Sequence, residues 1–218
     1  MQLRLCSLLL VVFYWAYSQG ATSDYSQIPT EHHKYMNCVR EMLSNDTQLF
    51  LKWGVGGTFS NNRTICWTSN RSDEYRSLGY PRHERFYNTV EAEDRWQERN
   101  TMYYVGLVKS IPSVIVESKK GGADDPEVNG TFTLLFATSQ CYVMGKLQVN
   151  ESAEAINSTK PFTDNSTCLL WAQRHGNETV KKLCEPAFIS NCSGIPGPVY
   201  KRGHGVCNCT DGIGSEED

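Results

Sequence analysis

The chain has 218 residues, enough for one domain with a substantial hydrophobic core. It carries 21 Lys or Arg residues against 24 Asp or Glu residues, so its formal net charge at pH 7 is −3. This mildly acidic balance argues against a nucleic-acid-binding protein, because binding to phosphates requires a basic face.

Residues 1–18 have the pattern of a secretory signal peptide. Arg4 supplies the positive charge, residues 8–13 form the apolar centre, and Ala16 and Ser18 are the small residues of a cleavage site. The apolar run is too short for a membrane anchor, and no later stretch is apolar enough to cross a bilayer. We therefore expect a secreted, extracellular protein with no membrane partner and a flexible N-terminus over 19–29.

The next segments predict a helix and then a series of short strands. The helix opens at Pro29-Thr30, and its apolar stripe consists of Tyr35, Met36, Val39, Met42 and Leu43. Gly54, Gly56 and Gly57 predict a bulge or bend in the first strand, and residues 70–85 look polar and irregular. Eight strands are expected in all, over residues 49–55, 63–69, 84–90, 101–108, 113–117, 131–138, 141–149 and 167–171.

Eight short strands without intervening helices predict a closed barrel or a sandwich. A second helical stripe follows, formed by Val180, Leu183, Cys184, Ala187 and Phe188. One helix before the strands and one after them favour a mainly β fold, an eight-stranded antiparallel up-and-down barrel over residues 30–193. Residues 194–218 are rich in Gly and Pro, and we expect their cysteines to pin them to the barrel.

The cysteine count indicates disulfide bonds. Of the nine cysteines, Cys6 lies in the leader, which leaves Cys38, Cys66, Cys141, Cys168, Cys184, Cys192, Cys207 and Cys209. An even number in an exported chain favours disulfides, and eight cysteines allow 105 pairings, so the pairing stays open. A zinc site is the alternative, but it needs close Cys pairs with matching His spacing, and the five histidines are scattered. We expect no metal and no cofactor.

Glycosylation acceptors are dense, and each predicts a solvent-facing position because a glycan is bulky. They are Asn45, Asn62, Asn70, Asn129, Asn150, Asn157, Asn165 and Asn177, with Asn191 and Asn208 as weaker acceptors whose middle residue is Cys.

Several motifs occur in an order and spacing that resemble tick salivary lipocalins, the family that includes the histamine-binding proteins. An N-terminal helix precedes an aromatic first strand, and the motifs that follow are Ile65-Cys66-Trp67, Cys168-Leu-Leu-Trp171 and Phe188-Ile-Ser-Asn-Cys192. The resemblance covers residues 30–193. It implies a monomeric lipocalin barrel that binds a small host mediator, with Cys141 bonded to Cys168 and Cys66 bonded to Cys192.

The chain departs from the family pattern at two acids. Members that bind biogenic amines have Asp directly after the cysteine that corresponds to Cys141, and Glu directly before the Leu-Trp pair. Here Tyr142 and Leu169 take those places. A buried ammonium needs a carboxylate partner. The acids that could replace them are Glu91, Glu93, Asp94, Glu98 and Glu117, although each is more readily a surface charge.

The strands are rich in aromatic residues, which favours an apolar cavity. The candidate ligand-binding residues are Trp53, Trp67, Tyr103, Phe132, Phe136, Tyr142 and Trp171, with Glu93 and Glu117 as candidate acids. For each aromatic the alternative is simple core packing. A cavity of this kind suits a lipid such as a leukotriene or a sterol better than a diamine.

These observations predict a carrier that sequesters a host mediator without chemistry. The sequence has no His-Glu-x-x-His and no Gly-x-Ser-x-Gly motif, so we expect no enzymatic activity. The alternative function is a protein-binding inhibitor of host immunity, of complement for example, acting through the segments 70–85 and 118–130.

Overall fold

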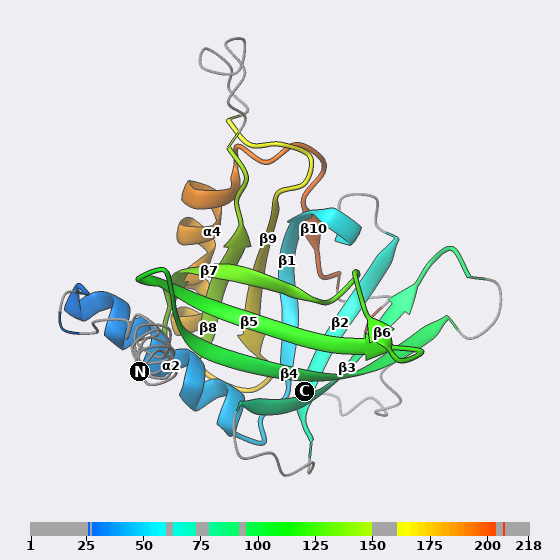
Figure 1. Ribbon diagram of the computed structural model, residues 1–218, viewed down its shortest axis with the longest axis horizontal. Helices are drawn as coiled ribbons and strands as arrows, with labels where there is room; N and C mark the ends of the chain where they lie inside the picture. Colours follow the sequence, from blue (N-terminus) through cyan, green and yellow to red (C-terminus); the bar gives the residue numbers. More distant parts are fainter. Residues whose placement is uncertain are drawn as a thin grey trace, which may run out of the picture.

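A computed structural model describes residue 26 and residues 28–59, 63–72, 79–91, 95–149, 161–203 and 207. Figure 1 shows a strongly curved sheet with one helix at its end and one on its outer side. The elements are α2 (Thr30–Ser44), β1 (Leu49–Gly56), the 3-10 turn η2 (Gly57–Phe59), β2 (Thr64–Arg71), β3 (Tyr80–Asn88), β4 (Trp96–Val108), β5 (Ile111–Lys120), β6 (Ala123–Asp124), β7 (Gly130–Ala137), β8 (Cys141–Lys146), β9 (Thr167–Gln173), α3 (Glu178–Lys182), α4 (Cys184–Cys192) and β10 (Tyr200–Lys201).

Eight strands form a closed antiparallel barrel. The order β1-β2-β3-β4-β5-β7-β8-β9 follows the chain, and β9 pairs back with β1 from Leu49↔Gln173 to Gly56↔Thr167. Two short strands pair outside this closed order, β6 with the end of β5 and β10 with β1. The predicted fold is confirmed: a mainly β, eight-stranded antiparallel up-and-down barrel with an N-terminal helix and a C-terminal helix.

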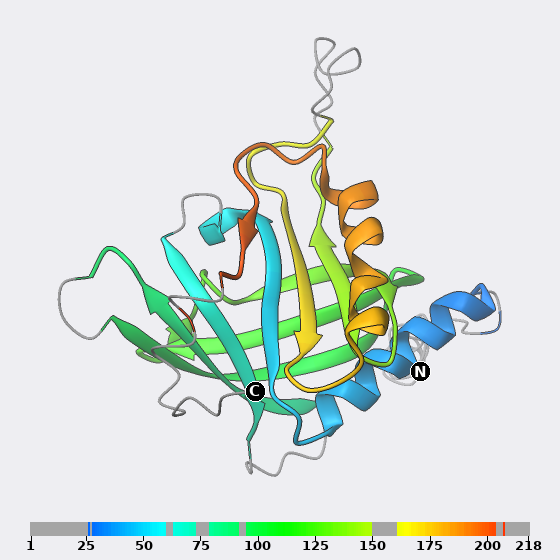
Figure 2. The same cartoon turned by 180° about the vertical axis from the view of Figure 1, so that it is seen from behind.

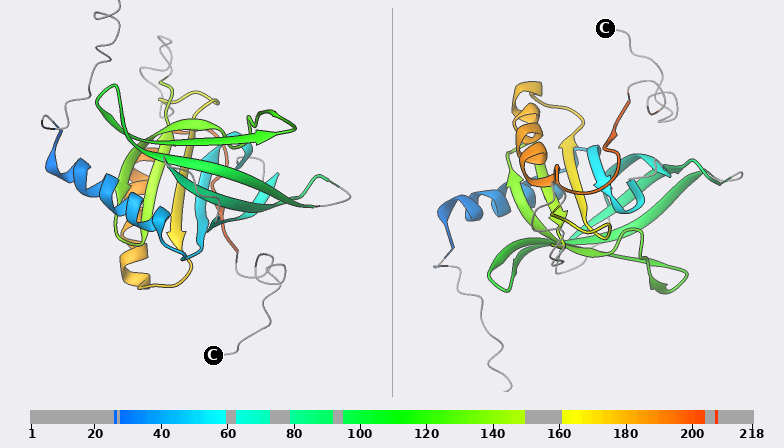
Figure 3. Two further views of the ribbon diagram at one scale, coloured as in Figure 1. Left: turned by 60° about the horizontal axis from the view of Figure 1, so that its bottom comes forward. Right: turned by 90° about the horizontal axis from the view of Figure 1, so that it is seen from above.

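Helix α2 covers one end of the barrel, as the left panel of Figure 3 shows. Its predicted stripe faces inward: Met36, Val39 and Met42 are fully buried. They join the main core, which fills the barrel at this end. Because a helix of this length is marginal in water by itself, this packing stabilises it.

Arg82 on β3 fastens the C-terminal end of α2 from inside the barrel. The side chain is fully buried, and its guanidinium donates hydrogen bonds to the carbonyl oxygens of Leu43 (3.2 Å), Asn45 (3.2 Å) and Thr47 (3.4 Å). It also donates to the carbonyl oxygen of Ser69 (2.6 Å). A cation complements the partial negative charge at a helix C-terminus. Arg82 thus closes this end of the barrel as a structural group.

The structure differs from the sequence prediction in the third and fourth strands. β3 begins at Tyr80 and β4 at Trp96, so half of the segment expected to be irregular is a strand. Pro81 and the charged residues after it do not look like a strand, but Pro81 lies next to the strand's first residue, where proline is tolerated. The pairing of Tyr80 with Tyr103 and of Arg82 with Thr101 fixes the segment.

Among the described residues, three disulfide bonds fasten the C-terminal segment to the barrel: Cys66–Cys207, Cys141–Cys184 and Cys168–Cys192. Cys184 and Cys192 mark the two ends of α4, which lies on the outer face of β8 and β9 (Figure 2). Cys38 has no disulfide partner among the described residues, and Cys209 lies outside them.

The pairing that the resemblance implied, Cys141 with Cys168 and Cys66 with Cys192, is therefore wrong. In the β8–β9 ladder Cys141 lies opposite Ala172, whereas Cys168 lies opposite Gly145. The two sulfurs are thus at opposite ends of the ladder, roughly 13 Å apart along the strands. A disulfide requires Cα atoms within about 7 Å.

Within the described ranges, no helix is both long enough and apolar enough to cross a membrane.

Candidate ligand-binding site

The barrel has a cavity of about 370 Å³ at the end away from α2. Its wall comes from seven of the eight barrel strands, from η2, and from two segments that cross the rim, 126–129 and 164–165. Small-molecule sites in proteins range from about 300 to 1,000 Å³, so this cavity is at the small end of that range. The fully buried side chains around Arg82 fill the rest of the barrel.

Aromatic side chains form much of the cavity wall. Trp67 stacks on Phe86 with ring centroids 3.9 Å apart and an interplanar angle of 11°. Phe59 packs against Trp67 at 5.5 Å, and Phe132 and Trp171 complete the wall from β7 and β9. Side chains alternate between the two faces of a strand, and the register of the barrel turns these rings inward.

Two indole N–H groups in this wall have no hydrogen-bond partner among the described residues. Trp67 Nε1 and Trp171 Nε1 are both buried, and each side chain is only 2% exposed. A buried donor without an acceptor costs about 1–3 kcal/mol. An oxygen atom of a guest that reached either indole nitrogen would recover that free energy.

Besides Glu127 and Asp164 on the two rim segments, Glu84 places a carboxyl group in the cavity. Its side chain is 1% exposed and accepts a hydrogen bond from the Tyr103 hydroxyl. Burial raises the pKa of Glu84 to about 7, although the Tyr103 hydrogen bond and the positive charge of Arg82 act in the opposite direction. Burial also raises the pKa of Tyr142, so this side chain stays a neutral phenol.

Glu84 was not among the predicted site residues, because it lies where the segment expected to be irregular, 70–85, meets the strand expected over 84–90. In the structure, Arg82, Glu84 and Phe86 alternate with outward residues over β3, and all three are buried. A strand extended back to Tyr80 would have put this acid inside the barrel.

A buried ion pair positions the loop that covers part of the cavity mouth. Arg99 Nε lies 2.6 Å from Asp125 Oδ2, and both side chains are almost completely buried. The guanidinium of Arg99 lies 5.5 Å from the ring of Phe86, which continues the aromatic stack of the wall. Asp125 accepts hydrogen bonds from the amides of Glu127 and Asn129. The loop that begins at Asp125 is therefore held against the barrel interior.

Four of the predicted aromatic residues line the cavity: Trp67, Tyr103, Phe132 and Trp171. Tyr142 is buried in the same core, below the cavity. Phe136 is half-buried and packs against Tyr35 of α2, with ring centroids 5.2 Å apart.

Trp53 lies outside the barrel. Its ring packs edge-on against Phe188 of α4 at 5.6 Å, and the Lys201 ammonium lies 4.7 Å from its centroid.

The candidate acids are also outside the cavity where the structure describes them. Glu98 is an exposed partner of His83 and Arg85 on the outer face, and Glu91 is exposed after β3. Glu93 and Asp94 lie outside the described residues.

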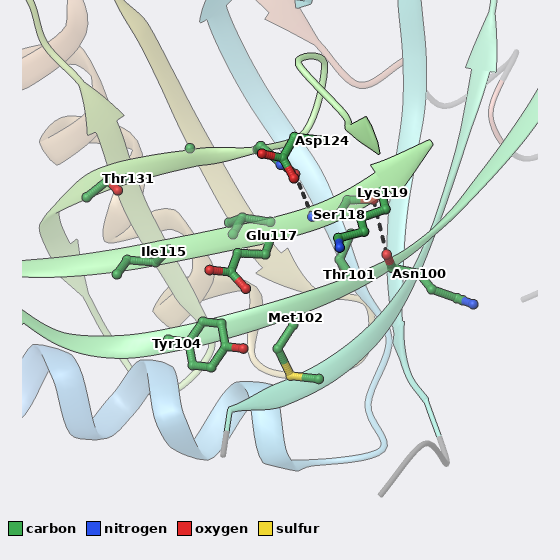
Figure 4. Close-up of a pocket in the computed structure, with 13 residues that line it drawn as sticks. Asn100, Thr101, Met102, Tyr104, Ile115, Glu117, Ser118, Lys119, Asp124 and Thr131 are labelled. Atoms are coloured by element: carbon green, nitrogen blue, oxygen red, sulfur yellow. Dashed lines mark hydrogen bonds between the residues drawn. The ribbon is translucent and has the colours of Figure 1, made fainter. Parts of the chain in front are cut away.

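Glu117 lies in a separate depression of about 630 Å³ on the outer face of β4, β5 and the start of β7. Figure 4 shows its carboxylate between the two long strands, near Tyr104 and Met102. Asn100, Glu117 and Lys119 in this depression are exposed. Although it is larger than the barrel cavity, its polar exposed lining makes it the weaker candidate for an apolar guest.

The described glycosylation acceptors lie at the surface in varying degree. Asn45, Asn165 and Asn177 are exposed, and Asn70 and Asn129 are half-buried. Asn62, Asn150 and Asn157 lie outside the described residues, and occupancy stays a prediction for all eight.

Across the part of the chain that the structure describes, no group of three or more His, Cys, Asp or Glu side chains could hold a metal ion.

Comparisons with known proteins give little similarity in sequence. No protein-family model and no curated protein matches the chain. Among solved structures, the chain is similar to Japanin from Rhipicephalus appendiculatus bound to cholesterol, with a TM-score of 0.42 and 14% identity over 73% of this chain and 93% of that one. The description of this chain as an up-and-down barrel accordingly rests on its own strand order and on the β9–β1 pairing that closes the barrel.

Proposed function

We propose that this chain is a secreted lipocalin that sequesters a small host mediator in its barrel, as the tick salivary family that its sequence resembles would do. The mechanism is binding without chemistry: a high-affinity carrier lowers the free concentration of its guest. The observation that carries the proposal is the aromatic cavity with two buried indole donors, Trp67 and Trp171, that lack a described acceptor.

The guest that fits best is a lipid with at least one oxygen acceptor, such as a sterol or a leukotriene. Aromatic walls favour an apolar body, and the indole N–H groups favour an oxygen on it. A diamine such as histamine needs a carboxylate counter-charge. Glu84 serves that purpose poorly, because burial favours its neutral form, Tyr103 already occupies it, and Arg82 is a competing cation. The other two acids of the lining are at the rim, where Glu127 lies 3.8 Å from Arg99 and Asp164 is exposed to solvent.

Two measurements test the proposal. Native mass spectrometry of the secreted protein should detect an apolar guest. Titration with cholesterol, leukotrienes, histamine and serotonin, followed by tryptophan fluorescence, should then give a Kd below about 10 μM for a lipid, which is roughly 7 kcal/mol of binding.

A matched pair of variants locates the site. Trp171→Phe keeps a ring in the wall and removes one donor, so lipid affinity should fall about 5- to 10-fold, the value of one hydrogen bond. Trp53→Phe makes the same change outside the barrel and should leave affinity within about twofold. Equal affinities in both variants, or histamine binding more tightly than every lipid, would contradict the lipid assignment.

One feature favours a second function, inhibition of a host immune protein through surface loops. Residues 119–124, which include the β5–β6 pairing, are all exposed and project from the barrel rim. If none of the four small molecules binds below about 10 μM, this function becomes the better one. A complex with a purified complement component, lost on deletion of 121–122, would then support it.

A further inference from the structure

At the floor of the barrel cavity, one oxygen of Glu84 has no hydrogen-bond partner among the described residues. The side chain lines the cavity and is 1% exposed. The Tyr103 hydroxyl donates to Oε1. Oε2 receives no such bond from the described part of the chain, and protein atoms do not enclose it completely. Oε2 is therefore the polar atom that a guest meets when it reaches the floor.

The strand that carries Glu84 holds the carboxyl group in this place. Alternate side chains of β3 point inward. Arg82, two residues before Glu84, binds carbonyl oxygens at the end of α2, and Phe86, two residues after it, stacks on Trp67. Glu84 thus lies between the filled end of the barrel and the aromatic wall of the cavity, and its inward neighbours on both sides are packed. The carboxyl group is therefore fixed at the boundary between the two.

Several titratable groups act on Glu84 from the elements around it. They are Arg82 on the same strand, Tyr103 on β4, Tyr142 on β8, Asp125 in the loop over the cavity mouth, and His83 on the outer face of β3. Both tyrosines are neutral phenols, because burial raises the pKa of each. Asp125 is paired with Arg99. The other charged residues of the lining, Glu127, Lys146 and Asp164, belong to the rim. The charge that a guest meets at the floor thus depends on whether Glu84 holds its proton.

The two forms of Glu84 offer a guest different hydrogen bonds. Burial raises the pKa of Glu84 to about 7, so both forms are present near neutral pH. The protonated carboxyl group donates one hydrogen bond and also accepts, whereas the ionised group only accepts. A guest hydroxyl can pair with either form, and a guest carbonyl only with the protonated form. A guest carboxylate meets the ionised form as a like charge, which is strongly unfavourable in a site with a low dielectric constant.

We propose that Glu84 selects guests by their polar group: the barrel admits a lipid whose inner end is a hydroxyl or a carbonyl oxygen and excludes one whose inner end is a carboxylate. This selection, which rests on the proposed carrier function, defines the chemical class of the guest. A sterol, which carries a hydroxyl group, meets the requirement. A leukotriene does not meet it when its carboxylate points inward.

Three probes with the same carbon chain and different polar groups test this selection: 1-decanol, 2-decanone and decanoate. Tryptophan fluorescence follows their binding, because Trp67 and Trp171 line the cavity. Between about pH 7 and pH 9 the affinity for decanoate should fall about tenfold per pH unit, since the complex must hold a proton that the free protein has released. The affinity for 2-decanone should fall about 5- to 10-fold in all, the value of one hydrogen bond, whereas that for 1-decanol should change less than about threefold.

A matched pair of variants assigns the effect to this side chain. Glu84→Gln keeps an acceptor for the Tyr103 hydroxyl and places an amide donor at the floor at every pH. Decanoate should then bind independently of pH and, near about pH 9, at least about tenfold more tightly than to the parent protein. Glu117→Gln removes an exposed carboxylate from the outer face and should keep the pH profile of the parent protein.

The outcomes separate this selection from the carrier function. Selection by Glu84 is overturned if the three probes show the same pH profile, if Glu84→Gln leaves the decanoate profile unchanged, or if cholesterol binds while none of the probes does. Each of these results leaves the carrier function standing. If neither the probes nor the larger lipids bind, the carrier function fails and the selection fails with it.

Discussion

Glu84→Gln tests whether the barrel holds a carboxyl group in its neutral form. Glutamine has nearly the shape of a protonated glutamate, and its side-chain oxygen can still accept the hydrogen bond from Tyr103. The variant therefore removes one titrating proton and little else. The difference in free energy of unfolding between the variant and the parent protein should therefore depend on pH, because Glu84 is buried in the folded barrel.

The raised pKa of Glu84 determines whether the stability of the parent protein rises or falls with pH. Glu84 titrates near 4.5 in the unfolded chain and at about 7 in the folded barrel. Below pH 4.5 both states hold the proton. Between these values the unfolded chain releases it first, so the parent protein loses stability as the pH rises towards 7. At about 1.4 kcal/mol per pH unit, the loss is about 3 kcal/mol.

Urea unfolding followed by tryptophan fluorescence, at intervals from about pH 4 to pH 8, measures the effect. The two proteins should be about equally stable near pH 4, and Glu84→Gln should be about 3 kcal/mol more stable near pH 8. Subtracting the two curves cancels the other titrating groups. Glu117→Gln, on the exposed outer face, is the control. The reasoning would be refuted if the difference in free energy of unfolding between Glu84→Gln and the parent protein did not change with pH. It would also be refuted if the parent protein became more stable than the variant as the pH rose.

Three further predictions concern stability and covalent structure. Arg82→Met should lower the free energy of unfolding by at least about 3 kcal/mol in urea, because three carbonyl oxygens at the end of α2 lose their donor; a loss below about 1 kcal/mol would contradict the role of this side chain. Gly56→Ala should lower the thermal midpoint measured by circular dichroism, since φ is +77° there and the new Cβ would lie 1.9 Å from the Ser166 carbonyl oxygen; an unchanged midpoint would be contrary evidence. Non-reducing peptide mapping should recover Cys66 joined to Cys207, and recovery of Cys66 with any other cysteine would show that the pairing described here is incorrect.

The barrel itself was predictable because its strands carry strong local signals. The alternation of Phe132, Leu134 and Phe136 indicates a half-buried strand in any context. The start of β3 was not predictable in this way, because Pro81 and three charged side chains precede Phe86. Pairing with β4 decides their conformation, and that pairing is a property of the whole barrel.

The direction of Trp53 shows a second limit. Counting in twos from Leu51 would place Trp53 inside the barrel. The β1–β9 register shifts between these residues, so that Leu51 lies opposite Trp171 and Trp53 opposite Leu170. One extra residue in a strand sends every later side chain to the other face. The glycines of this segment predicted a bend, but not the residue at which the faces change.

The disulfide pairing could not be predicted from local sequence patterns, for a different reason. Sequence fixes neither the register of β8 against β9 nor the position of α4 along them. Both decide which sulfurs meet.

The two disulfides that flank the segment from Cys192 to Cys207 have a consequence for self-association. One end of this segment is bonded to β9 and the other to β2, and its strand β10 pairs with the intervening β1. For β1 to exchange with a second molecule, it would have to separate from β9 and β2. The segment that the two disulfides bond to β9 and β2 crosses β1 and opposes that separation. Intertwined dimers, a common hazard when a terminal strand is released, should therefore form only after reduction.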